Sequence, residues 1–375
     1  MKSKHAVDHS LTWAQIDRKA LVHNIRAIKR LAKEKGILAI IKADAYGHGM
    51  VETAECLVHE KVNYFGVSDV REGIRLRKAG IKAPILLLEN TLPSMASLVV
   101  DHRLTATVCN KELAFVLHQE AKRKRRRVPI HIKIDTGMGR FGIWHTEAYE
   151  FIQMLRPLKG LDIEGIYTHF PSADTDLIFT QHQIDLFERI ILYLRSDDLR
   201  ISYIHAGNSA SLSGYRDRVL NLVRPGIMLY GLYPHERLRS LISLKPAMRV
   251  HSQVIFLKTI EKGRSISYGR TFVAKRRMKV ATVPLGYADG YFRSISGKGA
   301  VLIDGQRCPI LGRVTMDQVV ADVTKVKNLR LGSSVVILGK QKNNALLADD
   351  LAEWAGTINY EVTCSLGNRI ERKYV

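Results

Sequence analysis

Residues 37–49 read ILAIIKADAYGHG, so a lysine ends a run of five apolar residues and a loop with two glycines follows. Five apolar residues rich in isoleucine indicate a β-strand that is buried on both faces, as in a parallel sheet covered by helices. Lys42 therefore stands at the C-terminal end of a buried strand. It either extends to solvent along its own apolar stem or meets a partner, because burying an amine alone is costly. A lysine held away from water is also the residue type that attacks carbonyl groups.

Similar apolar runs recur along the first two thirds of the chain, separated by segments with helical spacing. The runs cover residues 37–41, 64–68, 84–88, 104–108, 129–134, 163–169, 202–206 and 223–230. Alternation of this kind fits both an open parallel sheet and a closed barrel. Eight strands that alternate with helices favour the closed (β/α)8 barrel.

The last third of the chain has the alternating pattern of exposed strands. Strand-like segments at 249–257, 279–283, 300–303, 319–323 and 334–338 are separated by glycine turns. The amino-terminal segment 1–16 contains a further strand at 11–16, which we assign to the same domain. We therefore expect an α/β protein with a (β/α)8 barrel over residues 12–240 and a mainly β C-terminal domain over residues 241–375.

Composition places the chain among globular proteins. It has 375 residues, 46% of them hydrophobic and 25% charged, which suits about two domains. No apolar run approaches the roughly 18 residues that a membrane span needs, so we expect a cytoplasmic protein. The four cysteines are far apart and form neither a disulfide framework nor a metal-binding pattern, so we expect reduced thiols and no metal site.

The net charge of +22 is high for an enzyme of small molecules, and residues 122–127 read KRKRRR. Such a run can bind phosphate backbones. It contains no aromatic residues for base stacking and belongs to no known nucleic-acid module. We therefore interpret it as a solvated surface turn that attracts anions without specificity, and we expect no specific nucleic-acid partner.

Polar residues able to do chemistry follow five of the eight predicted strands. In a barrel these C-terminal ends share one rim, where active sites assemble. The residues are Lys42, Lys133, Asp135, His169, His205, Asn208, Ser209 and Arg224. Loops after the last two strands of such barrels often bind phosphate through backbone N–H groups. Gly207-Asn208-Ser209 and Gly226-Ile227 supply small residues at both places, and a phosphate site beside a buried lysine suggests pyridoxal 5'-phosphate (PLP).

The motifs of the chain, taken together and in order, resemble the alanine racemase family from about residue 13 to residue 374. They are IIKADAYGHG (40–49), IKIDTGMGRFG (132–142), IEGIYTHF (163–170), IHAGNSAS (204–211), VRPGIMLYG (223–231), SYGRTF (267–272), VPLGYADGYFRS (283–294), LGRVTMDQ (311–318) and TINYEV (357–362). The resemblance implies a PLP-dependent isomerase that interconverts L- and D-alanine and supplies D-alanine for peptidoglycan.

The resemblance also implies a role for each matching residue. Lys42 would hold PLP as a Schiff base and act as one acid/base, and Tyr268 of the partner subunit would act as the other, so that a homodimer shares its active sites. Arg224 would face the pyridine nitrogen, with His169 and His205 around it. The phosphate would be bound by Tyr46, Ser209, Gly226, Ile227 and Tyr360, with Asn208 in the same cofactor site.

The substrate carboxylate would be bound by Arg140 and the N–H of Met316. Lys133 matches a position that is carbamylated in many relatives, where it would orient Arg140. Tyr287 would line the entrance, and Asp317 would support the site. The chain departs from the family pattern at Pro171, Gly207, Phe292 and Thr315, which leaves the preference for alanine over serine open.

Four other functions can be weighed against alanine racemisation. A PLP-dependent serine racemase would use the same groups. A fold-type III amino-acid decarboxylase shares the two-domain plan but carries an acid where Arg224 stands. A non-catalytic PLP-binding barrel would lack the domain that carries Tyr268 and Met316, and a nucleic-acid-binding protein would explain only the charge.

Overall fold

The computed structural model of the protein describes residues 10–215 and 217–375. They form two compact units. Residues 20–45 and 49–245 make one, called here the barrel unit. Residues 10–19, 46–48 and 246–375 make the other, called the β unit. None of the helices in the described ranges is long and apolar enough to cross a membrane.

The barrel unit contains a closed ring of eight parallel strands, which confirms the predicted fold class. β10 pairs with both β9 and β2, and β5 pairs with β6, so the ring has no open edge. A two-residue strand, β7 (Ile143–Trp144), pairs with the end of β6. The ring consists of β2 (Gly36–Ile40), β3 (Tyr64–Val67), β4 (Ile85–Asn90), β5 (Thr105–Val108), β6 (Val128–Asp135), β8 (Leu161–Tyr167), β9 (Tyr203–His205) and β10 (Leu222–Val223).

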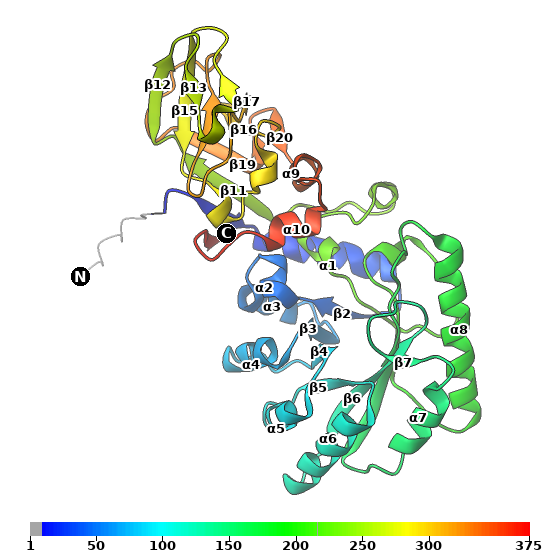
Figure 1. Ribbon diagram of the computed structural model, residues 1–375. Coiled ribbons are helices and arrows are strands. Elements are labelled where there is room, and N and C mark those ends of the chain that lie inside the picture. The colour runs from blue at the N-terminus through cyan, green and yellow to red at the C-terminus, as the bar shows by residue number, and fades with distance from the viewer. Residues whose placement is uncertain (1–9, 216) are drawn as a thin grey trace. The chain divides into compact units, whose positions relative to one another are not determined.

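Helices surround this ring, and α4 to α8 can be followed on its outside in Figure 1. Three of them begin where a side-chain carbonyl or carboxylate oxygen accepts a free N–H group, at Asp69, Asn110 and Asp176. The helices are α1 (Arg18–Ala32), α3 (Met50–Val58), α4 (Val70–Lys78), α5 (Ala96–Asp101), α6 (Lys111–Arg123), α7 (Ala148–Leu155) and α8 (Leu177–Ser196).

The predicted eighth strand, 223–230, is wrong in its extent. β10 ends at Val223, and Ile227–Tyr230 form a buried 3₁₀ helix, η3. Pro225 has no N–H to donate to a neighbouring strand, so the strand ends before Arg224-Pro225. A short apolar run has the same pattern in a buried strand and in a buried helix, so periodicity alone could not separate the two.

The β unit is built on a seven-stranded sheet in which β1 lies between β11 and β21. The predicted amino-terminal strand is therefore part of this unit, while residues 1–9 lie outside the described residues. The strands are β1 (Trp13–Ile16), β11 (Met248–Gln253), β16 (Ala300–Ile303), β17 (Gln306–Pro309), β19 (Ser334–Gln341), β20 (Asn344–Leu346) and β21 (Glu371–Tyr374).

A smaller three-stranded sheet of β12 (Phe256–Ile260), β15 (Met278–Val283) and β18 (Val319–Asp322) completes the unit, with the hairpin β13 (Ser265–Ile266) and β14 (Phe272–Val273). The predicted strand 249–257 is divided between the two sheets. At the division Val254 donates to the carbonyl of Ser333 and Ile255 to that of Thr282. Two helices follow, α9 (Ala348–Ala355) and α10 (Asn359–Cys364).

Candidate active site

Lys42 lies where β2 ends and a left-handed turn, α2 (Lys42–Tyr46), begins. The four residues after the lysine, Ala43 to Tyr46, all have φ between 50° and 56°. Residues other than glycine rarely adopt this conformation, because it costs roughly 1–2 kcal/mol for each of them. Four in succession form a strained segment, and strain of this kind concentrates at functional sites.

Two carboxylates of the barrel unit hold this turn in place. Asp44 accepts the N–H of Met50 at 3.1 Å and forms an ion pair with Arg75 at 2.9 Å. Glu72, on α4, accepts the N–H of Ala43 at 2.8 Å. These contacts come from residues up to 31 positions away in sequence. The position of Lys42 is therefore set by the packed barrel.

Arg224, at the end of β10, is buried among neutral hydrogen-bond acceptors. Nη1 donates to Nδ1 of His205 at 2.9 Å, and Nη2 donates to Nδ1 of His169 at 3.0 Å. Nη2 also donates to the backbone carbonyls of Thr168 and Ala206, at 2.9 and 2.8 Å. Burial lowers the pKa of Arg224 to about 10, which leaves it charged at neutral pH. Within the described residues, no carboxylate forms an ion pair with it.

The hydrogen bonds of Arg224 determine which ring nitrogen carries the proton in His205 and in His131. A guanidinium only donates, so Nδ1 of His205 must accept. Its Nε2 then carries the proton and donates to Nδ1 of His131 at 2.8 Å. Burial lowers the pKa of His205 well below its usual value and that of His131 to about 3, so both rings are neutral. Arg224 is thus anchored by a neutral chain that contains no acid.

His131 was missed from the sequence, although β6 carries a signal for it. His131, Lys133 and Asp135 alternate along the strand, so their side chains share one face. Polar residues at every second position of an otherwise apolar strand would have indicated that all three side chains point into the barrel. Tyr167 was missed as well, and its ring stacks on that of His205 with centroids 4.7 Å apart.

Lys133 is a buried amine with no hydrogen-bond partner among the described residues. It is 2% exposed, and its Nζ lies 3.3 Å from the centre of the Phe141 ring. Burial, followed by the charge of Arg140, lowers the pKa of Lys133 to about 8. Asp135 does not form an ion pair with it, but accepts the N–H groups of Gly137 and Gly139 at 2.8 and 2.9 Å. The amine is therefore available for chemistry or modification.

A pH effect on stability follows from Lys133. Its pKa is about 8 in the folded protein, against an ordinary lysine value of 10.5 in the unfolded chain, so the unfolded chain binds more protons between these limits. In buffer free of carbon dioxide, the unfolding free energy of the wild type should rise relative to that of Lys133→Met as the pH rises from about 8 to about 10.5. The gain should be at most about 3 kcal/mol. Urea unfolding of both proteins across this range measures it, and parallel curves would contradict it.

Four cations surround His169 in the barrel unit. After burial, the charges of Arg224, Arg140, Lys133 and Lys42 each lower its pKa, which falls well below the usual value. The predicted lysines and arginines thus lie close enough to act on one imidazole. A mouth with this charge suits a ligand that carries phosphate and carboxylate groups.

The loops after β9 and β10 meet through Ser209 and Gly226. The N–H of Gly226 donates to Oγ of Ser209 at 2.8 Å, and Ile227 then begins η3. Asn208 instead shapes its own loop, where its Oδ1 accepts the N–H of Ser211 at 3.1 Å. A Cβ on Gly207 would lie 2.9 Å from Oγ of Ser211, so a larger residue at this departure from the family pattern would require the Ser211 hydroxyl to move.

In the β unit, Tyr46 and Tyr360 come together from distant parts of the sequence. Their ring centroids are 6.0 Å apart, and burial raises the pKa of Tyr46. Gly47 has φ +82°, and a Cβ there would lie 2.1 Å from the carbonyl oxygen of Thr363 on α10. Only glycine fits at this crossing, which holds Tyr46 beside the helix that carries Tyr360.

The β unit also presents Tyr268, Tyr287 and Met316, which are 72%, 43% and 52% exposed. Tyr268 begins the 3₁₀ turn η5 (Tyr268–Arg270), between β13 and β14. Tyr287 donates its N–H to the carbonyl of Thr315 at 3.0 Å, which places it next to Met316. The hydroxyl of Thr315 donates to the carbonyl of Gln318 at 2.8 Å and so shapes the Met316 loop.

Asp317 stands on the same loop as Met316. Its carboxylate pairs with Arg369 at 2.9 Å. Arg369 is also within 3.3 Å of Asp289, so one arginine links two carboxylates of the β unit. Asp317 therefore supports the Met316 loop through Arg369.

In the barrel unit, cations gather at the C-terminal ends of the strands, which is where barrel enzymes place their active sites. These cations suit a small anionic ligand, so the class of protein is a barrel enzyme that acts on such a ligand. A β unit follows the barrel in the chain. The chain matches two family models that identify the enzyme more closely. Residues 16–234 match the alanine racemase N-terminal domain, and residues 247–374 match the alanine racemase C-terminal domain. The chain belongs to the alanine racemase family.

Individual alanine racemases are similar to this chain over nearly its full length. The alanine racemase of Geobacter sulfurreducens is 43% identical over 375 residues, which cover 98% of each chain. That of Carboxydothermus hydrogenoformans is 41% identical over 97% of this chain and 99% of its own. Among solved structures, the alanine racemase of Clostridium difficile 630 superimposes with a TM-score of 0.94 at 36% identity, covering 99% of this chain and 97% of its own.

Proposed function

We propose that the protein is a PLP-dependent racemase that interconverts L- and D-alanine, and that it acts as a cytoplasmic homodimer supplying D-alanine for peptidoglycan. The observation that carries the proposal is the environment of Arg224. Its four bonded acceptors are two neutral imidazoles and two carbonyls. A decarboxylase of this fold would carry an acid at the same place.

The residues of the site fit PLP. Lys42 supplies an amine for its aldehyde, and Arg224 supplies a donor for its pyridine nitrogen. For its phosphate, Ser209 would supply a hydroxyl and Ile227 a backbone N–H. The N–H of Gly226, which here donates to Oγ of Ser209, would turn to the phosphate, and we assign Tyr46 and Tyr360 to the same group. When bound, PLP withdraws electrons from Cα of the amino acid and so makes the α-proton acidic.

Arg224 limits how far this withdrawal goes. A guanidinium keeps its proton, so it donates a hydrogen bond to the pyridine nitrogen without protonating it. The neutral chain of His205 and His131 offers no other acid. Side reactions that require full withdrawal, such as transamination, are thereby suppressed, as suits an enzyme that only moves an α-proton.

Racemisation requires a proton to leave one face of Cα and to arrive at the other, so two acid/base groups are needed. We assign them to Lys42 and to Tyr268 of the partner subunit. The support for Tyr268 is its exposure of 72% within its own chain, which leaves the phenol open to a second subunit. Tyr287 is 43% exposed and would line the entrance to the same site.

Arg140 and the N–H of Met316 are assigned to the substrate carboxylate, because a guanidinium fork matches two oxygens. Lys133 would orient Arg140 as a carbamate. The ammonium group first loses a proton. The neutral amine then adds to carbon dioxide and releases a second proton, which leaves a carbamate anion where the cation stood. The pKa of about 8 leaves an appreciable neutral fraction near physiological pH, which supports this assignment.

Tyr268→Phe tests the two-base assignment. The change should lower kcat in both directions by on the order of 10²- to 10⁴-fold, because one of the two proton transfers loses its group. Exchange of the α-proton of alanine with deuterium on the face served by Lys42 should be less affected. Optical rotation measures racemisation, proton NMR of each enantiomer in D₂O measures the exchange, and Tyr193→Phe, on the exposed side of α8, is the matched control. Equal loss of exchange from both enantiomers would show that Tyr268 serves structure instead.

A further inference from the structure

The β unit carries a concentration of positive charge that racemisation does not use. β12 and β18 both pair antiparallel with β15, so the segments that follow β12, precede β15 and follow β18 lie at the same end of the small sheet. Backbone bonds join them, since Gly263 donates to Ala274 and Val323 donates to Lys279. We call this surface the basic end. Its cations are Lys262, Arg264, Lys275, Arg276, Arg277, Lys279, Lys325 and Lys327.

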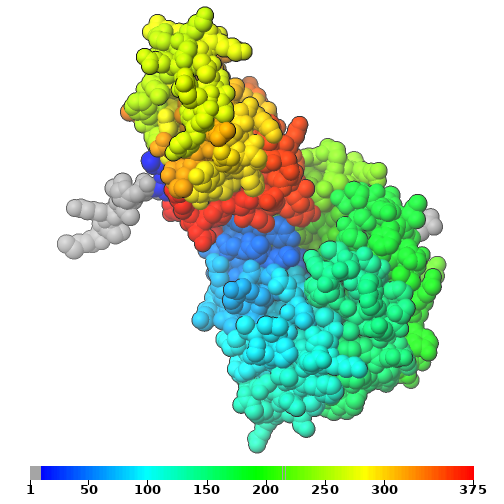
Figure 2. Space-filling view, viewed as in Figure 1, coloured from blue at the N-terminus to red at the C-terminus, as the bar shows by residue number. Residues whose placement is uncertain are grey.

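Little in the basic end neutralises these eight cations. The same segments contain two carboxylates, Glu261 and Asp322. Glu261 pairs with Arg277 at 3.2 Å, and Asp322 accepts the N–H of Thr324 at 2.9 Å. The other seven cations form no ion pair with any described residue. All but Lys279 are exposed, and the yellow and yellow-green part of the chain that includes residues 262–279 lies at the surface in Figure 2.

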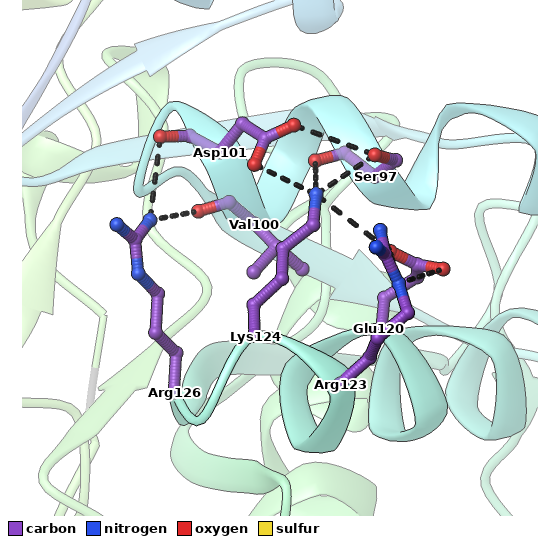
Figure 3. Close-up of polar contacts among 7 residues, drawn as sticks. All are labelled: Ser97, Val100, Asp101, Glu120, Arg123, Lys124 and Arg126. Atoms are coloured by element: carbon purple, nitrogen blue, oxygen red, sulfur yellow. Dashed lines mark hydrogen bonds and ion pairs between the residues drawn. The ribbon is translucent and has the colours of Figure 1, made fainter.

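The run 122–127 differs, although it is the most visible basic motif in the sequence. Residues 124–125 form a turn and five of the six residues are exposed, as interpreted from the sequence, but part of the charge is paired within the fold (Figure 3). Lys124 donates to the carbonyl of Ser97 and pairs with Asp101, and Arg126 donates to the carbonyl of Val100. Arg126 thus binds the C-terminal turn of α5, where helices favour positive charge, and Lys124 joins Ser97, near the start of that helix, to Asp101 at its end. The remaining pairs are Arg123 and Lys124 with Glu120, and Arg127 with Asp162.

The basic end has no such internal use, because it stands on a sheet and caps no helix. We propose that the basic end binds double-stranded nucleic acid through its phosphate backbone, without regard to base sequence. Arginine and lysine side chains in a group neutralise phosphates and release bound counterions. Arg264, Arg276 and Arg277 add planar forks that match phosphate oxygens.

The chemistry of the basic end favours nucleic acid over an anionic membrane. Stable attachment to a bilayer normally combines cations with an inserted apolar group. Of the apolar residues beside these cations, Ala274, Met278, Val323 and Val326 are buried, and Val273, in β14, is 45% exposed. One partly exposed valine among eight cations is little to insert into a bilayer, so the surface suits a partner that presents phosphates.

The basic end is separate from Tyr268 within the β unit. Ser265 pairs with Val273 and Ile266 with Phe272, so Tyr268 lies at the closed end of this hairpin. The open end of the hairpin is flanked by Lys262, Arg264 and residues 275–277. Changes at Lys275 and Arg276 therefore leave the proposed racemase site untouched.

The test compares two double variants of the full-length, PLP-loaded protein. K275Q/R276Q removes one lysine and one arginine from the basic end. K122Q/R125Q removes the same two residue types from the other basic run, at exposed positions that have no ion pair with a described residue. Fluorescence anisotropy of a labelled DNA duplex of mixed sequence, titrated at several salt concentrations, measures affinity. Racemase activity and thermal unfolding should match the wild type in both variants.

The wild type should bind the duplex with an affinity that falls steeply with salt. Each phosphate contact contributes about 0.9 to the slope of log affinity against log salt, so K275Q/R276Q should make the slope shallower by about two. K122Q/R125Q should leave it unchanged. Equal losses in both variants, no effect of K275Q/R276Q, or no duplex binding even at low salt would overturn the proposal. Binding to phosphatidylglycerol vesicles without binding to the duplex would overturn it in favour of a membrane partner.

Discussion

Replacing Lys42 by alanine should abolish racemisation while leaving the fold intact. The lysine is assigned two tasks, holding PLP covalently and moving a proton on one face of Cα, and both need its amine. A loss on the order of 10⁴-fold or more in kcat is expected, since one acid/base group alone typically contributes 10²- to 10⁴-fold. Two quantities are measured, the rate of alanine racemisation and the visible absorption of bound PLP. The wild type treated with borohydride, which removes this absorption, is the reference.

The fold should survive this change because the side chain of Lys42 is not part of the packed core. The strained turn beside it is held by Asp44 and Glu72 through backbone N–H groups, which alanine at position 42 retains. Circular dichroism and thermal unfolding should therefore match the wild type. Lys82→Ala, at an exposed position, controls for the loss of a lysine. An active Lys42→Ala protein would refute the assignment of the site.

The barrel could be predicted because its strands are short, apolar and regularly spaced, and because each pairs with a neighbour in the chain or one step away. The local path after Lys42 could not. Ala43 and Ala45 have no preference for positive φ, and a single aspartate in ADAY does not indicate a left-handed turn of four residues. The turn exists because Arg75 and Glu72, from α4, hold it, and such long-range contacts leave no local pattern.

In the candidate site, too, some residues could be predicted from the sequence and others could not. Residues at predicted strand ends, such as His205 and Arg224, could be placed on one rim because a barrel brings all C-terminal strand ends together. His131 lies two residues before Lys133 inside β6, so its role emerges only when β6 and β9 approach across the barrel. The fourth partner of Arg224, the carbonyl of Ala206, is a backbone group and has no signature in sequence.

Charge is the property for which sequence order misleads most. Residues 122–127 are consecutive and conspicuous, yet Lys124 and Arg126 are used inside the barrel unit. The basic end is assembled from three segments, the first and last of which are about 60 residues apart in the sequence, and only strand pairing reveals it. A net charge of +22 is thus distributed between structural and free cations that a linear count cannot separate.

Two inactive variants should restore activity when their subunits mix. Lys42 lies in the barrel unit and Tyr268 in the β unit, and the proposed site takes its lysine from one chain and its tyrosine from the other. In a heterodimer of Lys42→Ala and Tyr268→Ala chains, one site then receives both wild-type residues and the second receives both defects. This pattern requires a two-fold dimer in which each site is shared.

Random exchange of equal amounts makes half of the dimers mixed, and each of these has one intact site. Activity should therefore recover to about a quarter of the wild-type value per subunit, from parents that have almost none. Native mass spectrometry of one isotope-labelled parent verifies the exchange, and racemisation is followed in the same sample. If each chain carried its own complete site, no mixture of these parents could regain activity. Verified exchange without recovery would therefore assign Tyr268 to the site of its own chain, or to no site at all.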